Sequence, residues 1–280
     1  MDGADHSGLL VDDVSMVFTL PGGGSVHALK NVTMNLASGE LMSVLGPSGC
    51  GKTTLLNIIA GFLAPTEGAV FLNQHQVKGP AAERGMVFQQ GALFEWLNVR
   101  KNISFGPRMM GKPRKETKEK VDHLLDIVGL GDFGDKPVYQ LSGGMQQRAS
   151  IARALAFDAE ILLMDEPFGA LDEIVRDRLN EELLRLWRQT GKTIGFVTHS
   201  IPEAVYLSTK IVIMSPRPGR IAEVIDSPFP AERPLDDTAH RRLLVSRKRQ
   251  GPAHLHRGHT DARGQPAIDQ TFAETPAELG

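Results

Sequence analysis

The sequence predicts an α/β protein that is built on a parallel β-sheet and carries an inserted helical segment. Strand-like and helix-like segments alternate between residues 161 and 225, which implies crossover connections and therefore parallel strands. A glycine-rich loop separates a strand-like run from a helix-like run within residues 41–60. No convincing strand interrupts residues 92–157, which we interpret as the helical insertion.

Short strands are predicted over the N-terminal part of the chain. Residues 9–11 and 14–18 are apolar runs, and a Pro-Gly-Gly-Gly turn follows at residues 21–24. Residues 32–36 alternate apolar and polar side chains, which is typical of a half-buried strand. Residues 41–45 are more continuously apolar, as expected for a strand that is buried on both faces.

Helices dominate the middle of the predicted fold. A helix is expected from Thr53 to Ala60, where Gly61 ends it. Pro113 opens a charged helix with helically spaced apolar positions, and a further helix follows Gly143 and Gly144.

The alternation resumes after residue 157. We expect strands at 161–164, 193–197, 211–214 and 221–225, and helices at 174–189 and from about 201. Beyond residue 230 the periodicity dissolves into Pro, Gly, His and mixed charges. We therefore expect one domain over residues 9–230, with 92–157 inserted in it, and a partly disordered C-terminal tail over 231–280.

The composition argues against several classes of protein. With 41% hydrophobic residues the chain can bury a core, and a net charge of -2 argues against a general nucleic-acid-binding protein. The single cysteine, Cys50, excludes an internal disulfide and fits a reducing compartment. No run approaches the roughly 18 apolar residues of a membrane helix, and the N-terminus lacks the apolar core of a secretion signal. We expect a soluble cytoplasmic protein that reaches a membrane only through a partner.

Residues 46–53 fit the pattern G-x-x-x-x-G-K-[ST] in full, between a predicted strand and a predicted helix. Backbone N–H groups of such a loop and the positive end of the helix cradle phosphates, Lys52 adds a charge for the terminal phosphates, and the Thr53 hydroxyl is placed for Mg²⁺. An ordinary glycine-rich turn is the disfavoured alternative, and we interpret Cys50 as a small packed side chain rather than a redox group. The predicted nucleotide-contacting residues of this segment are Gly46, Pro47, Ser48, Gly49, Cys50, Gly51, Lys52, Thr53 and Thr54.

Two carboxylates end the apolar strand that is predicted at residues 161–164. Asp165 is placed to hold Mg²⁺, and Glu166 is placed to act as general base toward an attacking water or to orient it. An exposed acidic turn would look similar, and the phosphate loop favours the functional interpretation.

Ser142, Gly143 and Gly144 precede a predicted helix and form a candidate second anion site, although a simple helix cap has the same sequence. With Leu141 they form a Leu-Ser-Gly-Gly segment that begins twelve residues before Arg153. The phosphate loop lies far upstream of this segment, and Asp165-Glu166 follows Arg153 shortly afterwards. In this combination the chain resembles the ATPase subunits of ATP-binding cassette (ABC) transporters over about residues 9–226.

Within that family, the segments GPSGCGKTT, AERGMVFQ and DEPFGALD resemble importers of the taurine, aliphatic sulfonate, nitrate and bicarbonate group, and the taurine importers most. The resemblance implies a P-loop NTPase fold with an N-terminal antiparallel β-subdomain and an inserted α-helical subdomain. It implies ATP and Mg²⁺ as ligands and ATP hydrolysis coupled to transport. It further implies a homodimer of cassettes, separate transmembrane permease subunits, an extracytoplasmic substrate-binding protein, a peripheral position at the cytoplasmic face of the membrane and no nucleic acid.

The resemblance also assigns roles to single residues. Gln89 would touch Mg²⁺ and the attacking water, His199 would contact the γ-phosphate, and Asp172 would lie at the dimer interface beside the nucleotide. Phe18 would stack on adenine, although a core phenylalanine would look the same. Ser142 and Gly144 would face the nucleotide that the other protomer binds.

Other functions are disfavoured. A soluble, non-transport ABC ATPase usually has a second cassette, a long coiled coil or a basic domain, and a GTPase usually carries Asn-Lys-x-Asp; none of these occurs in the sequence. A binding-only cassette would not need Glu166, Gln89 and His199 together. In the tail, we favour a solvated segment over lipid contact by the basic cluster at 241–249, and over metal binding by the histidines at 254, 256 and 259.

Overall fold

Two β-sheets organise the protein, for which we describe a computed structural model over residues 7–88, 93–157, 159–169 and 171–227. The smaller sheet has the strand order β2-β1-β4-β5 and is antiparallel throughout. The larger sheet has the order β10-β9-β3-β8-β7-β6. All described residues lie in one compact unit.

The two sheets together contain ten strands, and six α-helices are found among the described residues. The smaller sheet contains β1 (Gly8–Thr19), β2 (Ser25–Ala37), β4 (Glu67–Leu72) and β5 (His75–Gln76). The larger sheet contains β3 (Leu41–Leu45), β6 (Arg84–Val87), β7 (Ile161–Asp165), β8 (Thr193–Val197), β9 (Lys210–Met214) and β10 (Ile221–Asp226). The α-helices are α1 (Lys52–Ala60), α2 (Val99–Met109), α3 (Arg114–Ile127), α4 (Gly143–Ala156), α5 (Glu173–Thr190) and α6 (Ile201–Leu207), and short 3₁₀ helices lie at Gly131–Phe133 and Val138–Gln140.

The predicted parallel arrangement is confirmed for β9, β3, β8 and β7, which pair in parallel in that order. The sheet continues in parallel from β7 to β6, a strand that the sequence did not predict. The prediction is wrong for the last strand, because β10 pairs antiparallel with β9. The connection over residues 215–220 explains the difference, since a parallel return needs a crossover of a dozen or more residues. Strands β3, β7 and β8 are buried along their whole length, which explains their continuously apolar sequences.

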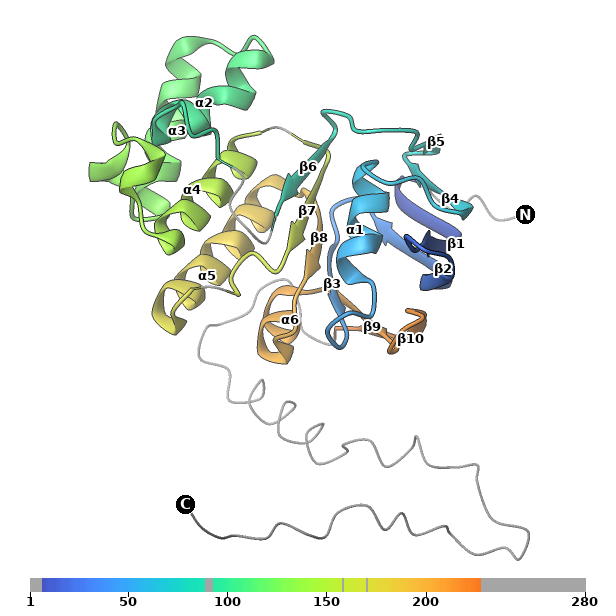
Figure 1. Cartoon of the computed structure of the whole chain (residues 1–280). Helices are drawn as coiled ribbons and strands as arrows, with labels where there is room; N and C mark the ends of the chain where they lie inside the picture. Colours follow the sequence, from blue (N-terminus) through green and yellow to red (C-terminus); the bar gives the residue numbers. More distant parts are fainter. Residues whose placement is uncertain (1–6, 89–92, 158, 170, 228–280) are drawn as a thin grey trace, which may run out of the picture. The chain divides into compact units, whose positions relative to one another are not determined.

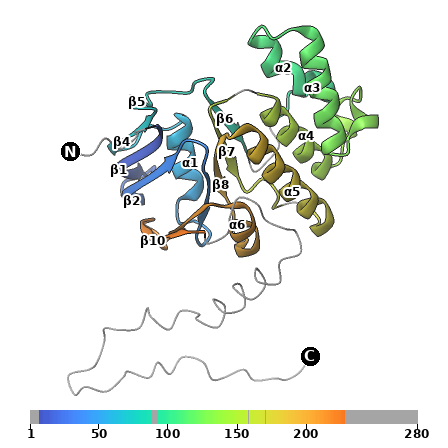
Figure 2. The ribbon, with the colours of Figure 1, turned by 180° about the vertical axis from the view of Figure 1, so that it is seen from behind.

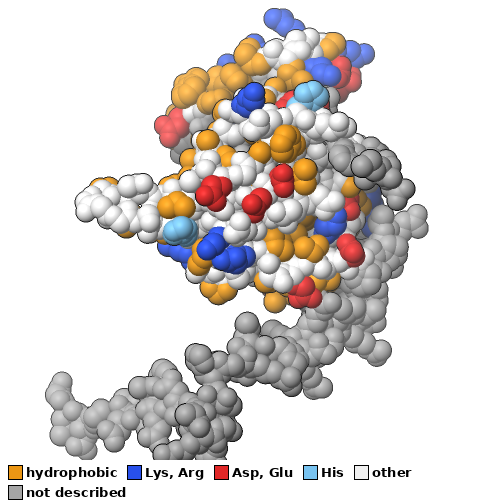
Figure 3. Space-filling model, turned by 90° about the vertical axis from the view of Figure 1, so that its right-hand side faces the viewer, with side chains coloured by type: hydrophobic (Ala, Val, Ile, Leu, Met, Phe, Trp, Pro, Cys, Tyr) orange, Lys and Arg blue, Asp and Glu red, His pale blue; other side chains and the backbone are white. Residues whose placement is uncertain are grey.

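Helix α1 lies between the two sheets, as Figures 1 and 2 both show. Its buried side chains, among them Leu55 and Ile59, join one apolar cluster with Val11 of β1 and Val44 of β3. The helix thereby fixes the small sheet against the large one and places the loop before it at the ends of the parallel strands. The face of the protein that carries the small sheet mixes acidic, basic and hydrophobic side chains, as seen from that side in Figure 3.

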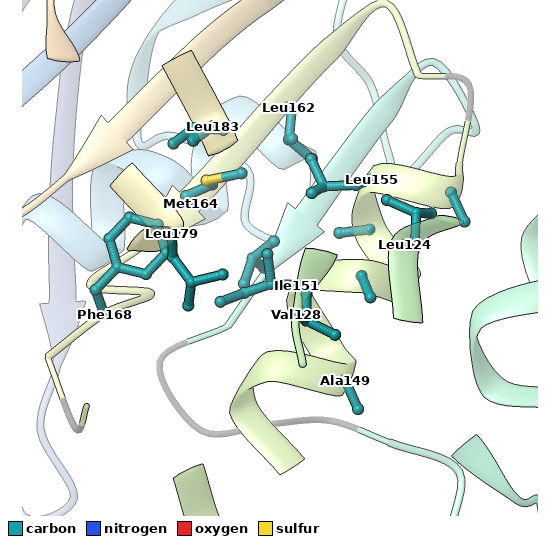
Figure 4. Close-up of a cluster of buried hydrophobic side chains, with 14 of the residues drawn as sticks. Leu124, Val128, Ala149, Ile151, Leu155, Leu162, Met164, Phe168, Leu179 and Leu183 are labelled. Atoms are coloured by element: carbon teal, nitrogen blue, oxygen red, sulfur yellow. The ribbon is translucent and has the colours of Figure 1, made fainter. Parts of the chain in front are cut away.

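The opposite face of the large sheet is covered by helices of the segment after residue 98 and by α5. Figure 4 shows the apolar cluster that joins them, with side chains from α3, α4, β7 and α5 meeting in one core. Its labelled members include Leu124, Val128, Ile151, Leu155, Leu162, Met164, Phe168, Leu179 and Leu183. Among the residues described, no helix combines the length and the apolarity that crossing a membrane requires.

Candidate active site

Glycines shape the loop between β3 and α1. Gly49 and Gly51 have φ angles of +74° and +104°, which side chains rarely adopt. A Cβ on Gly51 would lie 2.7 Å from Leu29 Cδ2, and one on Gly46 would lie 2.8 Å from Cys50 Sγ. Gly51 is the N-cap of α1 and supplies no side chain to cap it. The first backbone N–H groups of α1 are therefore left without a side-chain acceptor at the loop, where they can bind an anion.

Lys52 is folded back over this loop. Its side chain is buried, and its Nζ donates to the carbonyl oxygens of Gly46 at 2.8 Å and Pro47 at 3.1 Å. These bonds hold the ammonium at the concave side of the loop, where an anion bound by the backbone would meet it.

Asp165 ends β7 as a buried carboxylate with 4% exposure. Burial raises its pKa and Glu166 adds to the rise, whereas the Thr53 hydroxyl and Lys52 oppose it. Among the described residues, its Oδ1 has no hydrogen-bond partner. A buried, unpartnered carboxylate oxygen beside a threonine hydroxyl offers the oxygen ligands that Mg²⁺ prefers, so these residues fit a magnesium site.

Asp165→Asn is expected to stabilise the free protein by about 1 kcal/mol at neutral pH, because it removes a charge that burial disfavours and whose Oδ1 has no hydrogen-bond partner among the described residues. The raised pKa means that the folded state binds the proton more tightly than the unfolded state does. The free energy of unfolding therefore falls as the pH rises from the ordinary pKa through the raised one. Thermal unfolding in a chelator should show the variant ahead of the wild type at neutral pH, with a smaller gap at acidic pH. Asp226→Asn on the surface is the matched control, and a variant less stable than the wild type at neutral pH would contradict the argument.

Glu166 and His199 form a pair at the ends of neighbouring strands β7 and β8. Glu166 Oε2 lies 3.1 Å from His199 Nδ1. Glu166 has a φ of +44°, and its N–H donates to the Val197 carbonyl at 2.9 Å, which turns the side chain out of the strand end. The arrangement places a carboxylate and an imidazole where they can share a proton or a water.

Hydrogen bonds and an ion pair link Thr198, the residue before His199, to Glu203 of α6 and Arg176 of α5. Thr198 Oγ1 donates to Glu203 Oε2 at 2.5 Å, and Arg176 Nε lies 3.6 Å from Glu203 Oε1. Arg176 also donates to the Leu171 carbonyl at 2.8 Å, next to Asp172. The network therefore connects the strand end that carries His199 with the start of α5.

Gln147, which belongs to none of the predicted motifs, connects α4 to the segments on either side of the site. Its buried Nε2 donates to the carbonyl oxygens of Pro167 at 2.9 Å and Phe88 at 3.4 Å. Gln147 thus ties α4 both to the residue after Glu166 and to the residue before Gln89. Gln89 itself lies outside the described residues.

A pocket of about 510 Å³ opens over the glycine loop. Phe18 is 37% exposed and forms part of its wall, so it is a surface aromatic here rather than a core one. The pocket brings together most of the predicted loop residues, Glu166 and Arg217. Its full lining is Phe18, Leu20, Val26, Ala28, Ser48, Gly49, Gly51, Lys52, Thr53, Thr54, Glu166 and Arg217. Cys50 is not among these residues; it is buried in the core between the sheets.

Ser142, Gly143 and Gly144 are not among the described residues that line this pocket. Ser142 Oγ accepts a hydrogen bond from the Met145 N–H at 3.3 Å, which caps α4, and both Ser142 and Gly143 are exposed. A Cβ on Gly143 would meet nothing within 4 Å. Asp172 similarly caps α5 through a 3.0 Å hydrogen bond from the Val175 N–H. Both helix starts therefore present free surface beside their caps.

Comparison with known proteins identifies the group of proteins to which this site belongs. The family model described as ABC transporter matches residues 29–169. The taurine import ATP-binding protein TauB of Ruegeria pomeroyi is 61% identical over 223 residues, which is 80% of this chain and 83% of that protein. The chain belongs to the ABC transporter family.

Other relatives and solved structures agree with this ABC transporter assignment. An uncharacterized ABC transporter ATP-binding protein of Methanocaldococcus jannaschii is 50% identical over 240 residues, covering 86% of this chain and 89% of that protein. A dimeric ATP-binding cassette in a post-hydrolysis state, bound to ADP and phosphate, superposes with a TM-score of 0.70 at 31% identity, covering 79% of this chain and 99% of that chain. The predicted P-loop NTPase fold of ABC ATPases is thereby confirmed.

Proposed function

We propose that this chain is the ATP-binding and ATP-hydrolysing subunit of an importer for taurine or a related small sulfonate. The observation that carries the ATPase activity is the Glu166–His199 pair, with 3.1 Å between Oε2 and Nδ1, beside a pocket floored by the glycine loop and Lys52. Two relatives support taurine as cargo: the Ruegeria pomeroyi protein and one of Pelagibacter ubique at 54% identity are both named as taurine import ATP-binding proteins.

Each group of the site has a distinct task in this proposal. The loop N–H groups and Lys52 hold the phosphates, and Phe18 stacks on the adenine. Thr53 and Asp165, with Gln89, would hold Mg²⁺, which neutralises charge on the phosphates when bound. Glu166 accepts a proton from the attacking water or orients it, and His199, beside that carboxylate, contacts the γ-phosphate.

A head-to-tail pair of chains completes the site. The dimeric cassette with ADP and phosphate offers a precedent for pairing. Ser142 caps α4, and Gly143 and Gly144 begin it; none of the three is among the described residues that line the pocket of their own chain. Their backbone and hydroxyl donors, with Asp172 nearby, would close over the nucleotide of the partner and exclude water. ATP hydrolysis and loss of phosphate would then let the two chains separate.

The remaining features of the proposal concern the assembly. The cassette comprises residues 9–230 with 92–157 as its helical insertion, followed by the tail at 231–280. It docks on separate permease subunits at the cytoplasmic face of the membrane, and an extracytoplasmic binding protein delivers the cargo. Nitrate and bicarbonate remain the competing cargoes. Growth of a deletion strain on taurine as sole sulfur source tests the cargo, and normal growth with undiminished taurine uptake would contradict it.

Mixing two inactive variants is expected to restore ATP hydrolysis. Lys52→Ala removes the cation of one half-site and Ser142→Arg blocks the opposite half-site. In a head-to-tail pair of one of each, one composite site keeps both halves intact. Phosphate release should be lost for each variant alone and return on mixing. A mixture as inactive as its components would contradict a site shared between chains.

A further inference from the structure

The loop between β9 and β10 carries a cation, Arg217, into the pocket over the glycine loop, and this residue belongs to none of the motifs described above. Arg217 lies on this loop, is exposed, and lines the pocket together with Ser48 and Lys52. Its Nε donates to the Gly49 carbonyl at 3.1 Å. Its Nη2 lies 3.2 Å from the position that a Cβ on Gly49 would take, so the whole guanidinium rests against the glycine loop.

The backbone that carries Arg217 is fixed by hydrogen bonds to β2 and by a close approach to the glycine loop. The Gly219 N–H donates to the Ala28 carbonyl at 2.9 Å, and the Lys30 N–H donates to the Gly219 carbonyl at 2.9 Å. A Cβ on Gly219 would lie only 2.0 Å from the Cys50 carbonyl oxygen, so only glycine allows this approach. Prolines flank Arg217 on both sides and restrict the chain further. The guanidinium therefore extends from a rigid support rather than from a free loop.

The charged groups of the pocket indicate that Arg217 is available to bind phosphate oxygens. Among the described residues that line it, the charged ones are Lys52, Arg217 and Glu166. Lys52 Nζ already donates hydrogen bonds to the Gly46 and Pro47 carbonyl oxygens. A guanidinium has five N–H donors in a planar fork that matches phosphate oxygens, and Gly49 takes one of them.

We propose that Arg217 is a nucleotide-binding residue that contacts the polyphosphate of the bound nucleotide while it holds the Gly49 carbonyl. The inference rests on the proposed function, since it assigns a further ligand to the same pocket. Arg217 thus supplies the second positive charge of the pocket from a chain segment far from the glycine loop in sequence.

Calorimetric titration of the full chain with ADP and Mg²⁺ tests the assignment. Arg217→Ala is expected to raise the Kd about tenfold or more, because a charge-assisted phosphate contact is lost. Arg220→Ala, an exposed arginine of the same loop outside the pocket, is the matched control and should stay within about twofold of the wild type.

Two further variants separate a phosphate contact from a purely structural clamp. Arg217→Gln keeps a donor for the Gly49 carbonyl without the charge and should bind ADP as weakly as Arg217→Ala does, whereas Arg217→Lys should recover part of the affinity. Full recovery by Arg217→Gln, or an Arg217→Ala Kd equal to that of Arg220→Ala, would overturn the assignment. A wild type that binds no ADP would instead overturn the proposed function, and thermal unfolding of each variant confirms that it is folded.

Discussion

Replacing Glu166 by Gln is expected to lower ATP turnover by about 10²- to 10⁴-fold while ATP binding is retained. The amide keeps the size and much of the hydrogen-bonding capacity of the carboxylate, but it cannot accept a proton from the attacking water. Its contact with His199, 3.1 Å in the wild type, can persist, so the pocket keeps its shape. ATP should therefore stay bound and unhydrolysed, and the pair of chains should remain closed around it.

Two measurements follow the Glu166→Gln variant. Phosphate release reports the turnover, and size-exclusion chromatography with ATP reports the trapped dimer. Glu223→Gln is the matched control, because Glu223 is an exposed glutamate on β10. Undiminished hydrolysis in Glu166→Gln would remove Glu166 from the proposed chemistry, and a variant that binds no ATP would show that the substitution acts on binding instead.

The elements that the sequence predicted well are those whose structure is decided locally. Strands β3 and β8 have the predicted bounds, because each is a run of side chains that are all buried. Helix α1 ends at the predicted Gly61, which adopts a left-handed conformation with φ +85°. Apolar runs and capping residues are sufficient in such segments, since each signal lies within the segment itself.

Helix α2 was not predicted, because Gly106 and Pro107 lie inside it and both disfavour a helix interior. The reason for the glycine lies elsewhere in the chain: a Cβ there would sit 2.4 Å from Phe157 Cδ2, at the end of α4. Strand β6 was also missed, since it has four residues and begins with the buried Arg84, which donates to the Ala60 carbonyl at 3.4 Å. In both segments tertiary packing overrides the local signal.

The candidate site divides in the same way. The glycine loop with Lys52, and the pair Asp165–Glu166, are contiguous motifs at strand ends, so the sequence contains them whole. Arg217 and Glu203 lie in segments whose residues carry no recognisable spacing relative to these motifs. They reach the site only because the β9–β10 connection and α6 pack beside it, which requires the three-dimensional fold.

Lys52→Ala is expected to weaken binding of ATP and ADP by about 10- to 100-fold, because hydrogen bonds to charged groups contribute about 1.5–3 kcal/mol and the backbone loop alone leaves the terminal phosphates under-compensated. Lys52 is 6% exposed and already directed at the loop by the Gly46 and Pro47 carbonyls, so binding needs little reordering of its long side chain. Calorimetric titration measures the loss, with Lys30→Ala, an exposed lysine on β2, as the matched control. The loss should exceed that of Arg217→Ala, since Arg217 is exposed and solvent screens its charge. An unchanged Kd for ADP in Lys52→Ala would mean that the backbone cradle alone binds the nucleotide, and the role given to this cation would be wrong.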